Sequence, residues 1–113
     1  MSALTEKRCV PCEGGTPALS DGEVRQLLGQ VQGWKLAQPK GMSARIEKSF
    51  TFEGFMPGVD FVNEVARVAE GEGHHPDLML RWGEVRVRLW THAARGLTEN
   101  DFILAAKIDR LGA

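Results

Sequence analysis

Three histidines stand out among the residues that could carry chemistry. His74 and His75 are adjacent, and His92 is the third histidine of the chain. Imidazole titrates near neutral pH, so such a group can supply both a general acid and a general base. Close imidazoles also oppose each other's protonation, which favours a mixture of neutral and charged rings. These residue types indicate a site that removes a proton from one atom and donates one to another.

The sequence around the histidines predicts a β-hairpin that brings them together. Apolar and polar residues alternate in two segments, at about residues 77–82 and 85–92, joined by a short link. The adjacent pair precedes the first strand, where Pro76 favours an extended backbone, and His92 ends the second. The start of one antiparallel strand lies beside the end of its partner. We therefore expect the three imidazoles to surround one small space.

Two other interpretations of the histidines stay open. One is a polar loop with unrelated surface histidines, which is a common origin of a His-His pair. The other is a zinc site that combines the imidazoles with thiolates from Cys9 and Cys12. Adjacent residues of an extended segment point to opposite sides, so His74 and His75 chelate one ion only if the loop curls. A single C-x-x-C pair is also a weak zinc or redox signal, so acid-base chemistry of the histidines is favoured over a zinc site.

The other elements must position this hairpin. Capping boxes at Ser20 and Thr98 and the spacing of apolar residues predict three helices and four strands. The helices are expected at about residues 20–32, 55–70 and 98–111, and the strands at about residues 34–37, 44–52, 77–82 and 85–92. The order α-β-β-α-β-β-α is typical of an α+β fold with the helices packed on one face of the sheet.

Particular positions refine this prediction. Lys48 interrupts the apolar alternation of the second strand, which predicts a position near a sheet edge or a lysine that snorkels. The second helix is apolar on more than one side, which predicts contacts with the sheet and with another subunit.

The chain is expected to divide into two parts. Residues 1–19 lack periodicity and are expected to form an N-terminal extension of doubtful order, and residues 20–113 are expected to form the single compact domain.

The composition excludes several classes of protein. With 42% apolar residues, 26% charged residues and a net charge of −1, the chain is an ordinary globular protein, and no direct nucleic-acid binding is expected. No apolar run is long enough to span a membrane, and the first residues do not form a signal peptide. We therefore expect a cytoplasmic protein with reduced cysteines.

For the basic cluster of Arg81, Arg86 and Arg88, a solvated strand face is favoured over a site for an anionic ligand.

Seven residues carry a resemblance to a known family. Their types and spacing over thirty-two residues resemble the signature of the pterin-4a-carbinolamine dehydratases: Glu70, His74, His75, Pro76, Trp82, His92 and Asp101. The resemblance extends over about residues 20–111, through Gly33-Trp34, the Phe-rich second strand and the segment 96–98. It does not include the extension that carries the cysteines.

The resemblance implies a fold and an activity. It implies a four-stranded antiparallel sheet in subunits that assemble into a homodimer or homotetramer. The implied reaction is dehydration of a 4a-hydroxytetrahydropterin to quinonoid dihydropterin, which supports tetrahydrobiopterin recycling and requires no cofactor. His74 and His92 are then the acid-base pair, and His75 orients the pterin. The residues expected to border the substrate are His74, His75, Pro76, Thr91, His92, Ala93 and Ala94.

The other motif residues have structural alternatives. Asp101 lies where a helix-capping acid belongs, and this role is favoured over direct catalysis. Glu70 either orients a histidine or is a solvated carboxylate at a helix end. Trp82 is expected to pack beneath the site, whereas Trp34 and Trp90 are expected in the core or in an interface.

Two other functions also stay open. The family is also known for a dimerisation cofactor of a homeodomain transcription factor, so the apolar side of the second helix could bind a foreign partner. Self-assembly is the simpler use of that surface, because a symmetric contact needs no other chain. The zinc site described above would make the chain a metal-binding protein instead.

Overall fold

The structure is a computed structural model, and it describes residues 4–11 and 17–111. Within these residues the helices and strands follow the order α-β-β-α-β-β-α, which confirms the α+β prediction. The elements are α1 (Asp21–Leu28), β1 (Lys35–Ala37), β2 (Arg45–Thr51), α2 (Met56–Glu72), β3 (Asp77–Arg81), β4 (Glu84–Leu89) and α3 (Glu99–Asp109). Two short 3-10 turns add to these, η1 (Leu4–Glu6) and η2 (His92–Ala94). None of the helices in the described ranges is both long and apolar enough to cross a lipid bilayer.

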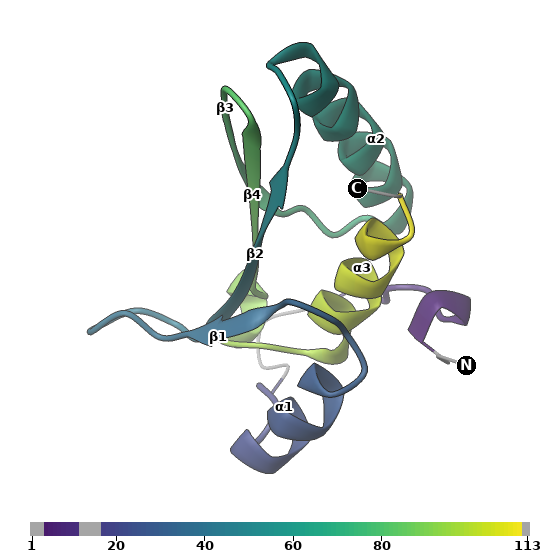
Figure 1. The fold of residues 1–113 in the computed structure, drawn as a ribbon. Helices are drawn as coiled ribbons and strands as arrows, with labels where there is room; N and C mark the ends of the chain where they lie inside the picture. The colour runs from purple at the N-terminus through teal and green to yellow at the C-terminus, as the bar shows by residue number, and fades with distance from the viewer. Residues whose placement is uncertain (1–3, 12–16, 112–113) are drawn as a thin grey trace.

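The strands of the described residues form one antiparallel sheet in the order β1-β2-β4-β3. In Figure 1, α2 and α3 lie along one face of this sheet, and α1 lies near one end of α3. Among the residues that the structure describes, no helix lies over the opposite face of the sheet, as the order of the elements predicted.

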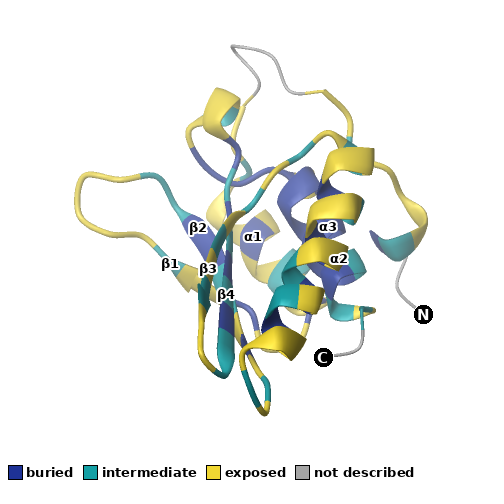
Figure 2. Cartoon of the chain, turned by 90° about the horizontal axis from the view of Figure 1, so that it is seen from above, coloured by how far each residue is buried: buried dark blue, intermediate teal, exposed yellow. Residues whose placement is uncertain are grey.

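The core lies between the sheet and the helices, where Figure 2 shows dark blue segments of buried chain. Ile46 pairs with Leu89, and Phe50 pairs with Val85, so these four side chains share the face of the sheet that meets the helices. Helix α3 is buried on more sides than its predicted stripe because α1, α2 and η1 all contact it.

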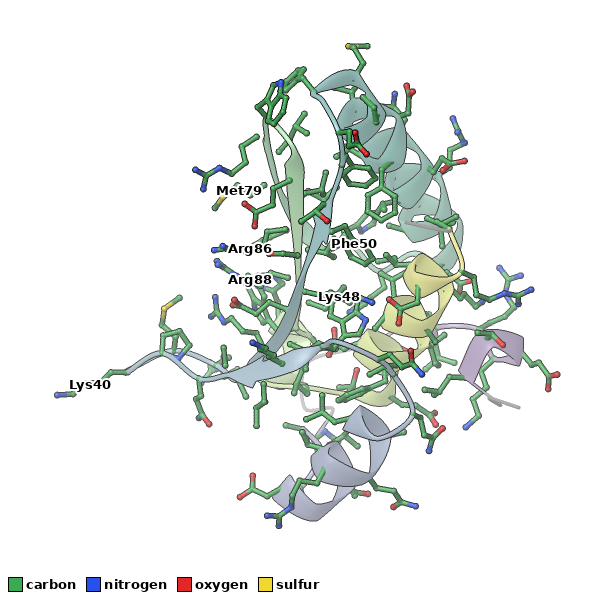
Figure 3. The ribbon with its side chains drawn as sticks, viewed as in Figure 1. Lys40, Lys48, Phe50, Met79, Arg86 and Arg88 are labelled. Carbon is green, nitrogen blue, oxygen red and sulfur yellow. The ribbon has the colours of Figure 1, made fainter. Side chains whose placement is uncertain are left out.

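Lys48 lies just beyond the part of β2 that β1 covers. Strand β1 pairs with β2 only at residues 45–47, so at Lys48 the strand pairs with β4 alone, which is a position near the sheet edge, as predicted. Lys48 shares the helix-facing side with Phe50, as Figure 3 shows, and its ammonium group donates to the Gln32 carbonyl and to Asp109, each at 2.8 Å. Asp109 also accepts the indole N–H of Trp34. A snorkelling lysine fits as well, because the ammonium group reaches Asp109 at the end of α3 and the Gln32 carbonyl after α1.

The ends of α1 and α2 differ from their predicted positions, and both differences involve glycine. Helix α1 begins with the predicted Ser20 capping box but ends at Leu28, because Gly29 follows and the next turn tightens into i→i−3 hydrogen bonds. Helix α2 continues through Gly71 and ends at Glu72, and Gly73 caps it in the left-handed conformation (φ 68°) that is common after a helix C-terminus. Gly73 therefore directs the chain from the helix into the adjacent histidines.

The open face of the sheet carries the basic cluster. Figure 3 shows Arg86, Arg88 and Met79 on the side of the sheet away from the helices. Arg88 Nε lies 3.3 Å from Glu47 Oε2, and Arg86 lies 3.5 Å from Glu84. The first pair joins β4 to β2 and the second lies within β4, and ion pairs of this kind agree with the solvated strand face that the sequence favoured.

The described part of the N-terminal extension packs against the domain. Leu4 in η1 is only 1% exposed and belongs to the core, and η1 contacts α3. Residues 4–11 therefore have a defined place along α3. The division of the chain at residue 20 stays a prediction.

Candidate active site

A pocket of about 360 Å³ lies where the end of α2, the start of β3 and the segment after β4 meet. Its lining residues are Val10, Gly73, His74, His75, Pro76, Asp77, Trp90, Thr91, His92, Ala93 and Asn100. All three histidines of the chain thus line one pocket, with Pro76, Thr91 and Ala93 of the expected border. Ala94 is not among the lining residues.

His92 reaches the pocket by a different route from the predicted one. Strand β4 ends at Leu89, so the prediction that His92 ends this strand is wrong. Thr91 forms an isolated bridge with Gly96, and the chain between them turns through η2, with Arg95 in a left-handed conformation (φ 54°). His92 begins this turn, which carries its ring to the pocket.

His74 is held by a buried carboxylate. Its Nε2 lies 2.6 Å from Asp101 Oδ1, and the side chains of His74 and Asp101 are 12% and 0% exposed. The second oxygen of Asp101 accepts the Thr91 hydroxyl at 2.8 Å and the Thr98 backbone N–H at 3.0 Å. A carboxylate without solvent is costly unless donors surround it, and here three donors do so.

Asp101 has the capping role that the sequence favoured, and it also holds a histidine of the pocket. It forms the capping box of α3 with Thr98, as the spacing predicted. The same side chain also orients His74, which lies 27 positions earlier in the chain. The helix cap and the pocket share one carboxylate.

His75 is paired with Glu70 at the surface. Its Nε2 lies 2.8 Å from Glu70 Oε1, and the two side chains are 61% and 83% exposed. Glu70 is thus bonded to a histidine, one of the two alternatives for this residue. Solvent weakens the attraction between two such exposed groups, so this pair adds little to the stability of the fold.

Trp90 forms part of the pocket wall, which the sequence analysis missed. The centre of its ring lies 4.6 Å from the centre of the His92 ring, and the guanidinium carbon of the buried Arg45 lies 4.4 Å from the centre of the Trp90 ring. The alternation of β4 had already placed Trp90 on the side of the strand away from the core. This alternation was the feature of the sequence that could have indicated a role for Trp90 outside the core.

Trp82 lies far from the place that its motif position suggested. It occupies the two-residue turn between β3 and β4 and is 72% exposed. The whole length of β3 separates it from His75, so the prediction that it packs beneath the site is wrong. Trp34, in contrast, is buried in the core as expected.

The cysteines give the pocket no metal ligand in the part of the chain that is described. No group of three or more His, Cys, Asp or Glu side chains could hold a metal ion there, and Cys12 lies outside that part. Burial and the charge of Glu72 raise the pKa of the Cys9 thiol to about 12, so this thiol is protonated at neutral pH.

Comparison with known proteins agrees with the fold and the pocket. The family model described as pterin 4 alpha carbinolamine dehydratase matches residues 17–111. Similar proteins named as putative pterin-4-alpha-carbinolamine dehydratases include one from Methylococcus capsulatus, 46% identical over 98% of this chain and 95% of its own. Another, from Halorhodospira halophila, is 48% identical over 98% of this chain and 99% of its own.

A solved structure gives the same result. A transcriptional coactivator/pterin dehydratase from Brucella melitensis aligns with a TM-score of 0.76 and 30% identity over 85% of this chain and 99% of its own. The chain therefore belongs to the pterin-4a-carbinolamine dehydratase family, whose enzymes are hydro-lyases.

Proposed function

We propose that this chain dehydrates a 4a-hydroxytetrahydropterin to the quinonoid dihydropterin, with His74 and His92 as the acid-base pair. Family membership supports the reaction, and the observation that carries the mechanism is the buried His74–Asp101 hydrogen bond in a pocket that His92 also lines. A pocket of about 360 Å³ falls within the range that holds small ligands.

His74 is the proposed base. Its Nε2–H donates to Asp101, so Nδ1 is the nitrogen that can accept a proton from the substrate. A buried carboxylate stabilises the imidazolium that forms, as an aspartate does behind a catalytic histidine in hydrolases. His74 Nδ1 takes the proton from N5 of the pterin while the electron pair of the N5–H bond forms the C4a=N5 double bond.

His92 is the proposed acid. Hydroxide leaves C4a poorly, so the oxygen must receive a proton as the C4a–O bond breaks. His92 is exposed at the pocket and can be protonated again by solvent after each turnover. The hydroxyl leaves as water, His74 returns its proton to solvent, and one water is lost from the substrate in all.

His75 is proposed to orient the pterin. Glu70 holds its Nε2, so the ring is directed while Nδ1 stays available for a hydrogen bond to the ligand. Thr91 supports the wall from within, because its hydroxyl bonds both Asp101 and the Thr98 hydroxyl. The proposed substrate contacts are thus made by residues held from behind.

The activity is tested by stopped-flow absorbance on a freshly generated 4a-hydroxytetrahydropterin. We expect decay of the substrate to accelerate in proportion to enzyme concentration and to continue after dialysis of the enzyme against a chelator. A decay that equals the uncatalysed rate at every enzyme concentration would overturn the proposed function.

Three finer proposals accompany this function. The first is that the reaction supports tetrahydrobiopterin recycling, and the second is a cytoplasmic location. The third is a homodimer or homotetramer, supported by the exposed Phe55 and Met56 at the start of α2 and by the free edge of β3.

A further inference from the structure

We infer that Val10, carried by the N-terminal strap of residues 4–11, completes the substrate pocket: its side chain contacts the pterin and helps to select it, and Asn100 is the residue that positions Val10. This inference rests on the proposed function and adds a part of the chain that the seven-residue motif does not include. Val10 lines the same pocket as His74, His75 and His92.

Asn100 holds Val10 by its backbone in both directions. The Val10 N–H donates to Asn100 Oδ1 at 3.1 Å, and Asn100 Nδ2 donates to the Val10 carbonyl at 2.6 Å. Asn100 is buried, so little solvent competes for these bonds. A paired donor and acceptor fix the strap here much as a neighbouring strand would, and the Val10 side chain stays exposed at 65%.

Further contacts fix the strap on either side of Val10. The Cys9 N–H donates to Glu72 Oε1 at 2.8 Å, and the other Glu72 oxygen pairs with Lys107 of α3. Burial raises the pKa of Glu72, but its hydrogen bonds with Lys107 and Cys9 outweigh this and lower the pKa, which keeps the carboxylate charged. The protonated Cys9 thiol contacts the Asn100 carbonyl at 3.5 Å, and Leu4 is buried in the core.

The strap and the proposed base are held by consecutive residues. Asn100 bonds Val10, and Asp101 bonds His74, both from the first turn of α3. A movement of the strap would therefore disturb the same helical turn that orients His74. This arrangement places an apolar side chain beside the ionisable ones, and an exposed valine in such a pocket gains from contact with the flat pterin ring.

Substitutions of Val10 test the inference in the full-length protein. Val10→Trp fills the space beside the histidines, and Val10→Gly removes the contact, while neither changes the hydrogen bonds of the strap. We expect KM to rise at least fivefold in both variants, with kcat within about threefold of the parent. The ratio of kcat/KM between 4a-hydroxytetrahydrobiopterin and its 6-methyl analogue should also change, because these substrates differ only in the side chain at C6.

Two further variants separate the effect of positioning Val10 from a general effect on the packing of the strap. Asn100→Ala removes both bonds to Val10, and we expect its KM to rise as in Val10→Gly. Lys7→Ala breaks the exposed ion pair between the strap and Glu99, away from the pocket, and should behave as the parent. Circular dichroism checks each fold, and the Val10 variants decide the matter if Asn100→Ala does not fold.

Calorimetric titration with stable 7,8-dihydrobiopterin keeps this test independent of turnover. Weaker binding to Val10→Trp supports the inference even if the parent proves inactive, in which case only the proposed function fails. Binding and KM equal to those of the parent in both Val10 variants would overturn the inference while leaving the dehydratase proposal intact.

Discussion

Exchanging Asp101 for asparagine is expected to lower kcat by about 100- to 10,000-fold, because the amide cannot hold His74 as a carboxylate does. Asp101 accepts from His74, from the Thr91 hydroxyl and from the Thr98 N–H. An asparagine of the same size presents an NH₂ group to at least one of these donors. Each buried donor left without a partner costs about 1–3 kcal/mol, so the free energy of unfolding should fall by a similar amount.

Urea denaturation and stopped-flow dehydration measure the two effects of Asp101→Asn. The matched control is Glu70→Gln, which makes the same chemical change in the exposed pair with His75. Its free energy of unfolding should stay within about 0.5 kcal/mol of the parent, as is usual for surface positions. An Asp101→Asn variant as stable and as active as Glu70→Gln would contradict the shared role of Asp101 in the helix cap and the pocket.

Replacing His74 with glutamine is expected to reduce kcat by about 100- to 10,000-fold, the range attributed to general acid-base catalysis. Glutamine keeps an amide N–H that can donate to Asp101, so the buried carboxylate retains a partner and the fold should survive. His75→Gln is the matched control in the adjacent residue. Because His75 is assigned to orientation, this variant should raise KM more than it lowers kcat.

The comparison of these two adjacent histidines is decisive for their roles. Initial rates of dehydration at steady state, measured over a range of substrate concentrations, give both kcat and KM. Equal losses of kcat in His74→Gln and His75→Gln would contradict the division of roles, and a folded His74→Gln with parental kcat would exclude His74 as the base.

Much of the fold could be predicted because its signals are local. The capping boxes at Ser20 and Thr98 and the two-residue turn of the β3–β4 hairpin follow from residues a few positions apart. The predicted hairpin also brought the three histidines around one small space. The motif residue Glu70 could be connected with a histidine because only five positions separate it from His75.

Other parts of the site depend on contacts that no local pattern encodes. The partner of the Lys48 ammonium group could not be predicted, because Asp109 lies 61 positions away. The position of Val10 depends on Asn100, 90 positions later, in an extension with no periodicity of its own. Trp82 was placed beneath the site from the motif, although the hairpin turn carries it to the opposite end of β3.

The pH dependence of kcat/KM tests the acid-base assignment most directly, measured for the parent, His74→Gln and His92→Gln after subtraction of the uncatalysed rate. A base acts only when deprotonated, so its titration gives the limb that rises with pH, and an acid acts only when protonated, so it gives the limb that falls. We predict a bell-shaped profile for the parent, loss of the rising limb in His74→Gln and loss of the falling limb in His92→Gln. Profiles in which both variants keep both limbs would contradict the account.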